Sequence, residues 1–354
     1  MVIRMNIYQL LPNFILGDGI GNEVMEIYNV LRREGYNTKV FADGIDPMIS
    51  RDIAGPVCDM PLLSKDDIIL YHLSIGTDLN QYLEKLSCRI IFRYHNITPA
   101  SFFEPYNRLS AELCRRGEDE LIELKEVPHY CLAVSEYNKQ ELIKVGYKCK
   151  IDVLPILLNY KKYDLPPSNE ILQRYHDDYV NLIFVGRIAP NKRQDDVLKA
   201  YHMYKRLYNP KSRLFIVGSY SDEDLYYKEI IQLIERKGIE DVIITGHIPL
   251  EEEVAYYKLA HTFVCMSEHE GFCIPLVEAM YFGVPIIAYR SSAVAETLGE
   301  NGVIVDSKDM NYIAKVINET MSAKTEINRS RKTICDKFSY EITRDKLLKY
   351  IKQF

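Results

Sequence analysis

The stretch from Thr262 to Glu278 reads TFVCMSEHEGFCIPLVE. Its first five residues form an apolar run that predicts a buried strand. Pro275 fits the first position of a helix, and Gly283 can cap the end of that helix. A strand, a tight loop and a helix in this order are typical of α/β folds, in which ligands bind beyond the carboxyl ends of parallel strands. The stretch therefore predicts a ligand site that includes Glu270, in the loop, and Glu278, about one turn into the helix.

The same alternation of short β-rich runs and amphipathic segments extends over the whole chain. It predicts two Rossmann-like domains in tandem, each with a parallel sheet covered by helices. In the first half the candidate strands are Met5–Leu11, Thr38–Ala42, Ile68–Leu73, Arg89–Tyr94 and Tyr130–Val134, and the candidate helices are Gly21–Glu34, Leu79–Leu86, Asn107–Lys125 and Glu136–Val145. In the second half the candidate strands are Asn181–Val185, Arg213–Val217, Val242–Thr245, Thr262–Met266, Pro285–Ala288 and Val303–Val305.

Length and linker composition indicate where the two domains meet. A chain of 354 residues exceeds the size at which one hydrophobic core usually keeps growing. Prolines and charged turn formers gather between residues 152 and 169. We therefore expect an N-terminal domain over residues 1–160 and a second domain over residues 161–338. Residues 339–354 predict a terminal helix with Ser339 as its N-cap, and we expect this helix to cross back to the N-terminal domain.

Composition and charge exclude several classes of protein. The net charge of −6 argues against a nucleic-acid-binding protein that depends on bulk positive charge. Eight cysteines lie scattered without zinc-binding spacing and predict reduced thiols. The N-terminal run is short, and no later segment reaches the ~18 apolar residues of a membrane span. We expect a cytoplasmic protein, and peripheral contact with the inner face of a membrane remains open.

A second candidate binding loop follows the first strand of the second half. Gly186 and Arg187 end this strand, and Lys192 follows in the loop. Glycine allows the backbone to approach a ligand, arginine offers a rigid fork for phosphate, and lysine adds a mobile charge. The loop therefore suits an anion. For each segment by itself a simpler interpretation stays open: a solvated basic loop here, and two solvated acids at Glu270 and Glu278.

The order of these motifs resembles family four of the retaining glycosyltransferases, which have the GT-B fold. In the second half the matching segments are Gly186-Arg187 with Lys192, Gly246-His247, Glu270-Gly271-Phe272 with Glu278, and Glu296. In the first half, Gly17–Asn22 opens a helix and Tyr94–Pro99 follows a strand, as in bacterial members that build surface polysaccharides. The resemblance implies two Rossmann-like domains facing across a cleft, with the donor on the second domain and the acceptor on the first.

The resemblance also implies how the donor is bound. Arg187 and Lys192 hold the donor pyrophosphate and stabilise charge on the leaving nucleoside diphosphate. Glu270 binds hydroxyls of the donor sugar, and Glu278 accepts hydrogen bonds from the ribose. The other implied donor-binding residues are Gly19, Gly186, His247, Gly271 and Phe272, with the amides around Ile274 and Leu276 at a helix start. We expect no metal and no other cofactor, because the two cations can neutralise the pyrophosphate.

On the first domain, the resemblance implies an acceptor side formed by Asp18, His95 and Asn96. His95 follows a strand and is expected to contact the donor sugar through its backbone carbonyl or a ring nitrogen, with Asn96 as support. No protein nucleophile is expected, since the leaving phosphate takes the proton of the acceptor. The implied catalytic residues are Arg187, Lys192, Glu270 and His95.

Two further motifs have competing interpretations. Gly17–Gly21 with Asp43 resembles a dinucleotide site, but its spacing is G-x-G-x-G, and Asn22 stands where the third glycine would be. Asp222–Asp224 resembles a D-x-D metal site, but these acids begin an amphipathic segment and are expected to serve a helix N-terminus.

Together these features predict retaining transfer of a hexosyl group from a nucleoside-diphosphate sugar to a glycan or lipid-linked acceptor, in bacterial surface polysaccharide synthesis. A nucleotide-sugar epimerase of the same fold is one alternative. A catalytically silent glycan-binding or partner subunit is another. Guanosine diphosphate mannose and uridine diphosphate hexoses fit the motifs equally, because specificity depends on pocket shape.

Overall fold

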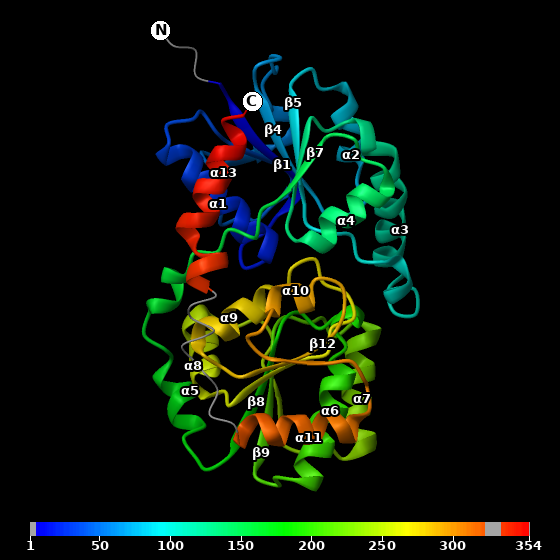
Figure 1. The fold of residues 1–354 in the computed structure, drawn as a ribbon, viewed down its shortest axis with the longest axis vertical. Helices are drawn as coiled ribbons and strands as arrows, with labels where there is room; N and C mark the ends of the chain where they lie inside the picture. Colours follow the sequence, from blue (N-terminus) through cyan, green and yellow to red (C-terminus); the bar gives the residue numbers. More distant parts are fainter. Residues whose placement is uncertain (1–4, 323–333, 354) are drawn as a thin grey trace. The chain divides into compact units, whose positions relative to one another are not determined.

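A computed structural model describes residues 5–322 and 334–353, which form two compact units (Figure 1). The first unit contains residues 5–101, 109–159 and 338–353, and the second contains residues 102–108, 160–322 and 334–337. The expected boundaries at residues 160 and 338 thus lie one residue from those of the structure. The expectation was wrong for residues 102–108, which group with the second unit because the Tyr106 ring packs edge-on against Tyr226, with centroids 5.1 Å apart.

The first unit contains a parallel sheet of seven strands in the order β3-β2-β1-β4-β5-β6-β7. Its strands are β1 (Ile7–Phe14), β2 (Val40–Ile45), β3 (Ala54–Pro56), β4 (Ile68–Leu73), β5 (Arg89–Tyr94), β6 (Tyr130–Ala133) and β7 (Lys150–Val153). Its α-helices are α1 (Gly19–Arg33), α2 (Asp78–Tyr82), α3 (Arg108–Glu123), α4 (Glu136–Val145) and α13 (Tyr340–Ile351). Short 3-10 turns lie at Val57–Asp59, Leu83–Lys85, Ala100–Phe102 and Leu124–Glu126.

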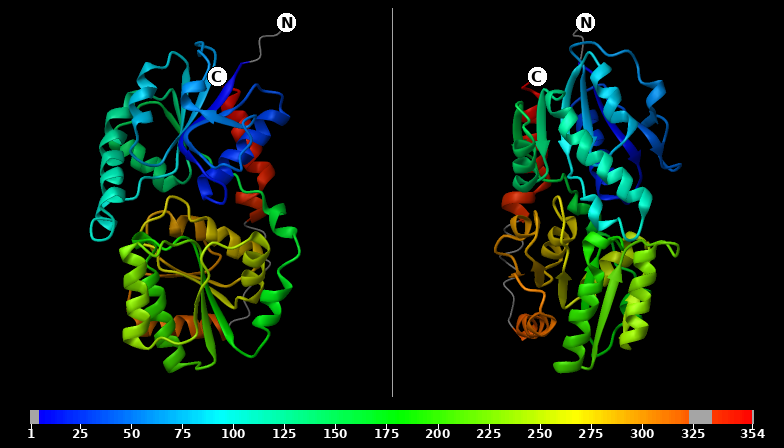
Figure 2. Two further views of the ribbon diagram at one scale, coloured as in Figure 1. Left: turned by 180° about the vertical axis from the view of Figure 1, so that it is seen from behind. Right: turned by 90° about the vertical axis from the view of Figure 1, so that its right-hand side faces the viewer.

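Both faces of this sheet are buried, as expected of parallel strands covered by helices. On one face, Tyr71 and Phe92 pack beneath α2, α3 and α4. On the other face, Leu70 packs with Ile27 of α1 and Leu347 of α13. Figures 1 and 2 show α13 lying beside α1. The last helix of the chain therefore completes the core of the first unit.

The second unit contains a parallel sheet of six strands in the order β10-β9-β8-β11-β12-β13. Its strands are β8 (Val180–Val185), β9 (Ser212–Val217), β10 (Val242–Ile244), β11 (Thr262–Cys265), β12 (Ile286–Tyr289) and β13 (Val303–Val305). Its α-helices are α5 (Asn169–Arg174), α6 (Gln194–Leu207), α7 (Leu225–Lys237), α8 (Leu250–Leu259), α9 (Ile274–Phe282), α10 (Val294–Leu298) and α11 (Met310–Ser322). Short turns lie at Tyr160–Asp164 and Pro190–Lys192, and a π-helical turn at Ile334–Phe338 leads to α13.

The core of the second unit is formed where α6, α7 and α11 pack on β8, β9 and β11. Helix ends follow the capping chemistry expected from the sequence. The Asp224 carboxylate accepts a hydrogen bond from the amide of Tyr226 at 2.8 Å, so the acidic run at 222–224 ends in an N-cap. Gly283 ends α9 with a φ of 70°, a conformation that favours glycine. Among the described residues, no helix is both long and apolar enough to cross a membrane.

The strand orders fix where a ligand can bind in each unit. In the first unit the chain reverses its direction of winding between β1 and β4, and in the second between β8 and β11. At such a switch point the connections leave to opposite sides, so the carboxyl ends of the two strands open a crevice. Most candidate site residues follow these strands or their direct neighbours, whereas His247 follows β10, two strands from β8.

Candidate functional site

The switch point of the second unit brings together the two loops that the sequence singles out. Gly186 and Arg187 follow β8, and Glu270 lies in the loop after β11, the strand that pairs directly with β8. Asn191 joins the loops, since its side-chain amide donates to the carbonyl of His269 at 3.0 Å. Segments separated by about eighty residues in the sequence thus form one local site.

Lys192 and Glu270 are the central pair of this site. The Lys192 ammonium lies 2.6 Å from both carboxylate oxygens of Glu270, whose side chain is only 7% exposed. Burial pulls the pKa of Lys192 down, but the charge and hydrogen bonds of Glu270, together with the nearby thiols of Cys273 and Cys265, hold the pKa above its ordinary value. Lys192 therefore stays positively charged, and its charge compensates that of the buried Glu270 carboxylate. A ligand that hydrogen-bonds to either side chain must therefore compete with, or add to, the contact between the ammonium and the carboxylate.

Hydroxyl side chains from the segment after β12 hold the Glu270 loop in place. The Ser292 hydroxyl accepts a hydrogen bond from the Glu270 amide at 2.7 Å. Ser291 donates to the carbonyl of Ser267 at 2.6 Å, and Thr297 donates to the carbonyl of Phe272 at 2.5 Å. The loop is thus preorganised by its neighbours. From this segment the sequence motifs include Glu296, but they do not predict the roles of these three hydroxyls. Glu296 is exposed on α10.

Arg187 differs from Lys192 in that it forms no ion pair with Glu270. Its side chain is exposed, and among the described residues no acid pairs with its guanidinium. Its carbonyl accepts a hydrogen bond from the Gln194 amide at 2.9 Å, which fixes the backbone of the loop. Arg187 is therefore available to an anion, whereas Lys192 is already paired with Glu270.

The glycines at this edge allow three strand ends to approach one another. Gly186 has a φ of 144°, and a Cβ atom on Gly218 would lie 2.3 Å from the carbonyl oxygen of Gly186. Gly218 also bridges to Gly246, and His247 next to it is exposed. The backbone thus comes close only because side chains are absent. This accounts for the glycines without requiring a ligand.

Glu278 is buried on α9, and each of its oxygens has a tyrosine partner. Tyr163 donates to Oε1, and Tyr257 donates to Oε2 at 3.0 Å. The carboxylate also faces Glu253, whose pKa rises to about 8 because of burial and then of the Glu278 charge. A ribose diol would have to share Glu278 with these hydroxyls, which sequence reasoning did not foresee.

The start of α9 offers one of the two amides expected to bind phosphate. The Leu276 amide already donates to the carbonyl of Cys273 at 3.1 Å. The Ile274 amide, at the first helical position, has no acceptor among the described residues. Phe272 is buried beside it, and Gly271 is half-buried. The helix start therefore offers a single amide from this pair.

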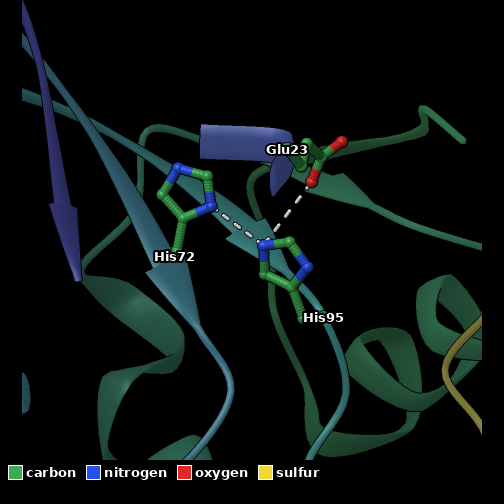
Figure 3. A group of neighbouring side chains, drawn as sticks. All are labelled: Glu23, His72 and His95. Carbon is green, nitrogen blue, oxygen red and sulfur yellow. Dashed lines mark hydrogen bonds and ion pairs between the residues drawn. The ribbon is translucent and has the colours of Figure 1, made fainter. Parts of the chain in front are cut away.

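In the first unit, His95 follows β5 and belongs to a buried polar cluster (Figure 3). Its Nε2 lies 2.9 Å from Nδ1 of His72 on β4 and 3.7 Å from a carboxylate oxygen of Glu23 on α1. Glu23 pairs with Arg93 of β5, whose guanidinium nitrogen lies 2.6 Å from Oε1. Burial lowers the pKa of His95 well below its ordinary range, and the Arg93 charge lowers it further. His95 is therefore neutral near pH 7.

The other predicted residues of the first unit have different surroundings. Asp18 is exposed at the start of α1, and its side chain makes no capping hydrogen bond. Gly19 has no positive φ, whereas Gly17 has a φ of 81°. The side-chain amide of Asn96 donates a hydrogen bond to Glu141 at 3.0 Å. This contact ties the segment after β5 to α4. Of the three residues expected on the acceptor side, Asp18 has an exposed side chain, whereas His95 and Asn96 are buried.

Sequence reasoning missed Glu23, His72 and Arg93. The signal was present, because His72 and Arg93 stand inside otherwise apolar strands and are completely buried. Glu23, His72 and His95 could together hold a metal ion by distance alone. Arg93, however, already occupies both oxygens of Glu23 and places a positive charge beside the group, so these residues suit a hydrogen-bonded cluster better than a cation.

Comparison with known proteins places this geometry in context. Residues 170–334 match the sequence model of the family described as glycosyl transferases group 1. The O-antigen chain mannosyltransferase B of Escherichia coli is 27% identical over 251 residues, which cover 68% of this chain and 64% of that protein. The capsular polysaccharide biosynthesis glycosyltransferase CapM of Staphylococcus aureus is 25% identical over 245 residues, or 63% of this chain and 62% of that protein. The matches thus span slightly less than two thirds of these relatives.

Solved structures share the fold over almost the whole chain. The sucrose-phosphate synthase of Thermosynechococcus elongatus has a TM-score of 0.79 at 17% identity, with 98% of both chains covered. Anabaena HepE, solved in complex with UDP-glucose, has a TM-score of 0.77 at 15% identity, with 99% of this chain and 100% of that chain covered. At such low identity the likeness establishes the fold.

Proposed function

We propose that the protein is a retaining glycosyltransferase, because residues 170–334 match the model of the glycosyl transferases group 1 and the chain has the GT-B fold. In this proposal it moves a hexosyl group from a nucleoside-diphosphate sugar to a glycan or lipid-linked acceptor. The names of the relatives, an O-antigen mannosyltransferase and a capsule glycosyltransferase, support a role in bacterial surface polysaccharide synthesis. The observation that carries the proposal is the Lys192–Glu270 pair at the switch point of the second unit.

The proposed roles follow from the surroundings of each side chain. Arg187 is exposed and lacks an acidic partner among the described residues, so it is proposed to bind the diphosphate and stabilise its charge as it leaves. Lys192 is proposed to contribute the second positive charge. Glu270 then accepts hydrogen bonds from sugar hydroxyls, and Glu278 accepts them from the ribose. Two cations on the leaving group support a reaction that needs no metal.

Without a protein nucleophile, retention at the anomeric carbon requires that the acceptor oxygen attack from the face that the diphosphate leaves. In the proposed step the anomeric carbon–phosphate oxygen bond breaks, and the acceptor oxygen–carbon bond forms. The acceptor proton passes to the departing phosphate oxygen, so no protein base is needed. The protein contributes positioning and charge stabilisation.

The test is to incubate the purified full chain with GDP-mannose and, separately, with UDP-glucose, and to measure release of the nucleoside diphosphate. We expect donor hydrolysis or transfer, and a loss of roughly a hundredfold or more in Arg187→Ala. Arg206→Ala, an exposed arginine on α6, serves as the matched control. Isomerised donor without diphosphate release would indicate an epimerase. Binding without any turnover would indicate a silent partner subunit. Unchanged turnover in Arg187→Ala would show that Arg187 does not stabilise the leaving diphosphate.

A further inference from the structure

The polar cluster of the first unit forms a continuous chain of hydrogen bonds that ends on His95. It begins on β1, where Gln9 is completely buried, crosses to His72 on β4, and reaches His95 after β5. β1 and β4 are the strands of the switch point, where a ligand can bind beyond the carboxyl ends. The direction in which each hydrogen bond runs can be worked out from the groups at its beginning.

The first step is the orientation of the Gln9 side chain. Its Nε2 lies 2.9 Å from the carbonyl oxygen of Val24, which can only accept a hydrogen bond, so Nε2 must be the donor there. Its Oε1 therefore faces Nε2 of His72, at 3.0 Å. Because an amide oxygen can only accept, His72 must carry a proton on Nε2.

The second step concerns the two rings. Burial lowers the pKa of His72 well below its ordinary range, and so does its neighbour His95, so His72 is neutral and its Nδ1 is unprotonated. Nε2 of His95 lies 2.9 Å from that acceptor and 3.7 Å from the Glu23 carboxylate. Nε2 of His95 must then carry the proton, which leaves Nδ1 of the neutral ring as an acceptor. This tautomer is set by the chain of contacts.

Nδ1 of His95 has no hydrogen-bond partner although it is buried. Figure 3 shows it on the far edge of the ring, pointing away from both His72 and Glu23. A buried acceptor without a partner is unfavourable unless a ligand supplies a donor. The groups that cover this edge have to move aside for that ligand. A sugar hydroxyl has the required polarity, whereas a phosphate oxygen does not, since it offers only acceptors.

We infer that Gln9 and His72 are positioning residues that hold His95 in its Nε2–H tautomer, so that Nδ1 accepts a hydrogen bond from a sugar hydroxyl. The inference rests on the proposed function for the identity of the ligand as a sugar. A contact of His95 with the donor sugar is already expected from the family resemblance. The inference adds the tautomer of His95 and two positioning residues that the motifs do not contain. The hydroxyl can belong to the donor sugar or to the acceptor glycan, and the experiment separates these sources.

Nitrogen NMR of the histidine-labelled full chain tests the tautomer without any ligand. We expect the His95 resonances to show an unprotonated Nδ1 and a protonated Nε2. In Gln9→Met, His72 loses the acceptor that fixes its own proton and can donate from Nδ1, so the His95 ring should gain the opposite tautomer. Gln140→Met, an exposed residue on α4, is the matched control and should leave the His95 resonances unchanged.

Ligand titration then tests the acceptor role of Nδ1. GDP-mannose or UDP-glucose should shift the Nδ1 resonance of His95 if the hydroxyl comes from the donor, whereas GDP and UDP should not. A shift caused instead by α-methyl mannoside or α-methyl glucoside would place the acceptor sugar there.

Two substitutions of His95 provide the matched comparison. His95→Asn keeps a side-chain oxygen near the place of Nδ1, whereas His95→Gln extends its amide toward the place of Nε2. We expect His95→Gln to weaken binding of the responding sugar ligand by roughly tenfold more than His95→Asn, and to leave nucleoside diphosphate affinity unchanged.

A protonated Nδ1 in the unliganded wild type would overturn the inference, and so would an Nδ1 resonance that no sugar ligand moves. Equal affinities of the two His95 variants for the responding ligand would likewise overturn the ligand role. Failure of the proposed function has a different signature: no donor turnover, and no binding of nucleoside diphosphates. The tautomer measurement does not depend on either.

Discussion

The ammonium nitrogen of Lys192 lies 2.6 Å from both carboxylate oxygens of Glu270. The pair joins the loops that follow two neighbouring strands, β8 and β11, and the Glu270 side chain is almost entirely shielded from water. A charge in that position is tolerated only because its partner is fixed beside it. The contact therefore links the two loops, and we propose that it is also where the hydroxyls of a ligand bind.

We predict that Lys192→Met lowers the free energy of unfolding by about 2–3 kcal/mol, because it leaves the buried Glu270 carboxylate unpaired. This loss is smaller than that expected for breaking a fully buried ion pair, because the Lys192 side chain is partly exposed. The double variant Lys192→Met with Glu270→Gln should recover part of the loss. Urea unfolding followed by circular dichroism measures each variant.

The control for this cycle is an ion pair of similar length on the surface. Lys211 lies 2.5 Å from Asp178, and both side chains are well exposed. Lys211→Met should cost far less stability than Lys192→Met, because water screens an exposed ion pair. Equal losses for Lys192→Met and Lys211→Met would show that the Lys192–Glu270 contact adds no more than a surface pair does.

The tyrosines around Glu278 allow a second prediction about buried charge. Tyr257 donates a hydrogen bond to this carboxylate at 3.0 Å, so Tyr257→Phe should cost about 1.5–3 kcal/mol of unfolding free energy. Tyr160 is the matched control, because its buried hydroxyl has no hydrogen-bond partner. Tyr160→Phe should be neutral or stabilising. A stability ranking in the reverse order, measured by urea unfolding, would contradict the assignment of partners.

Much of the fold could be predicted because its signal is local. Each strand expected from an apolar run overlaps a strand of the structure, and Ile68–Leu73 and Arg89–Tyr94 agree at both ends. The two strands that were missed, Ala54–Pro56 and Lys150–Val153, lie at the edges of the first sheet. Lys150–Val153 contains two charged residues, and Ala54–Pro56 has only three residues, two of which are glycine and proline. Neither has the continuous apolar run that marks a central parallel strand.

The site was less predictable because its contacts join distant segments. The motifs identified Lys192, Glu270 and Glu278 as candidates, but not that Lys192 and Glu270 neutralise each other, nor that two tyrosines hold Glu278. Such pairings depend on which loops the sheet topology brings together. His72 could have been flagged, since a histidine inside the run IILYHL has to find a buried partner.

The buried pair between Arg93 and Glu23 predicts a large loss of stability in the first unit. Both side chains are fully buried, and Arg93 also donates to the carbonyls of Leu154 and Pro155, at 2.5 and 3.1 Å. Arg93→Met should therefore cost about 3–5 kcal/mol. Hydrogen exchange of the β5 and β6 amides measures this locally, because the other unit has its own core.

The control for Arg93 lies on the same strand. Arg89 forms a longer and more exposed ion pair with Asp66, at 4.0 Å. Arg89→Met should change the exchange of these amides by less than about 1 kcal/mol. Similar exchange in the two variants would mean that the buried pair contributes little.

Glu253 predicts a specific dependence of stability on pH. Burial, and then the charge of Glu278, raises its pKa from 4.5 to about 8, while Lys162 opposes the shift. Between these pH values the folded chain holds a proton that the unfolded chain has released. The contribution of Glu253 to stability is thus fully present below pH 4.5, is lost as pH rises through about 8, and stays constant above that.

Glu253→Gln, which is always neutral, should match the wild type in stability near pH 5 and exceed it near pH 9 by roughly 2–4 kcal/mol. Thermal or urea unfolding across this range measures the difference, with the exposed Glu251→Gln on the same helix as control. If Glu253→Gln and the wild type kept a constant difference from pH 5 to pH 9, the carboxyl of Glu253 would not be the group that titrates.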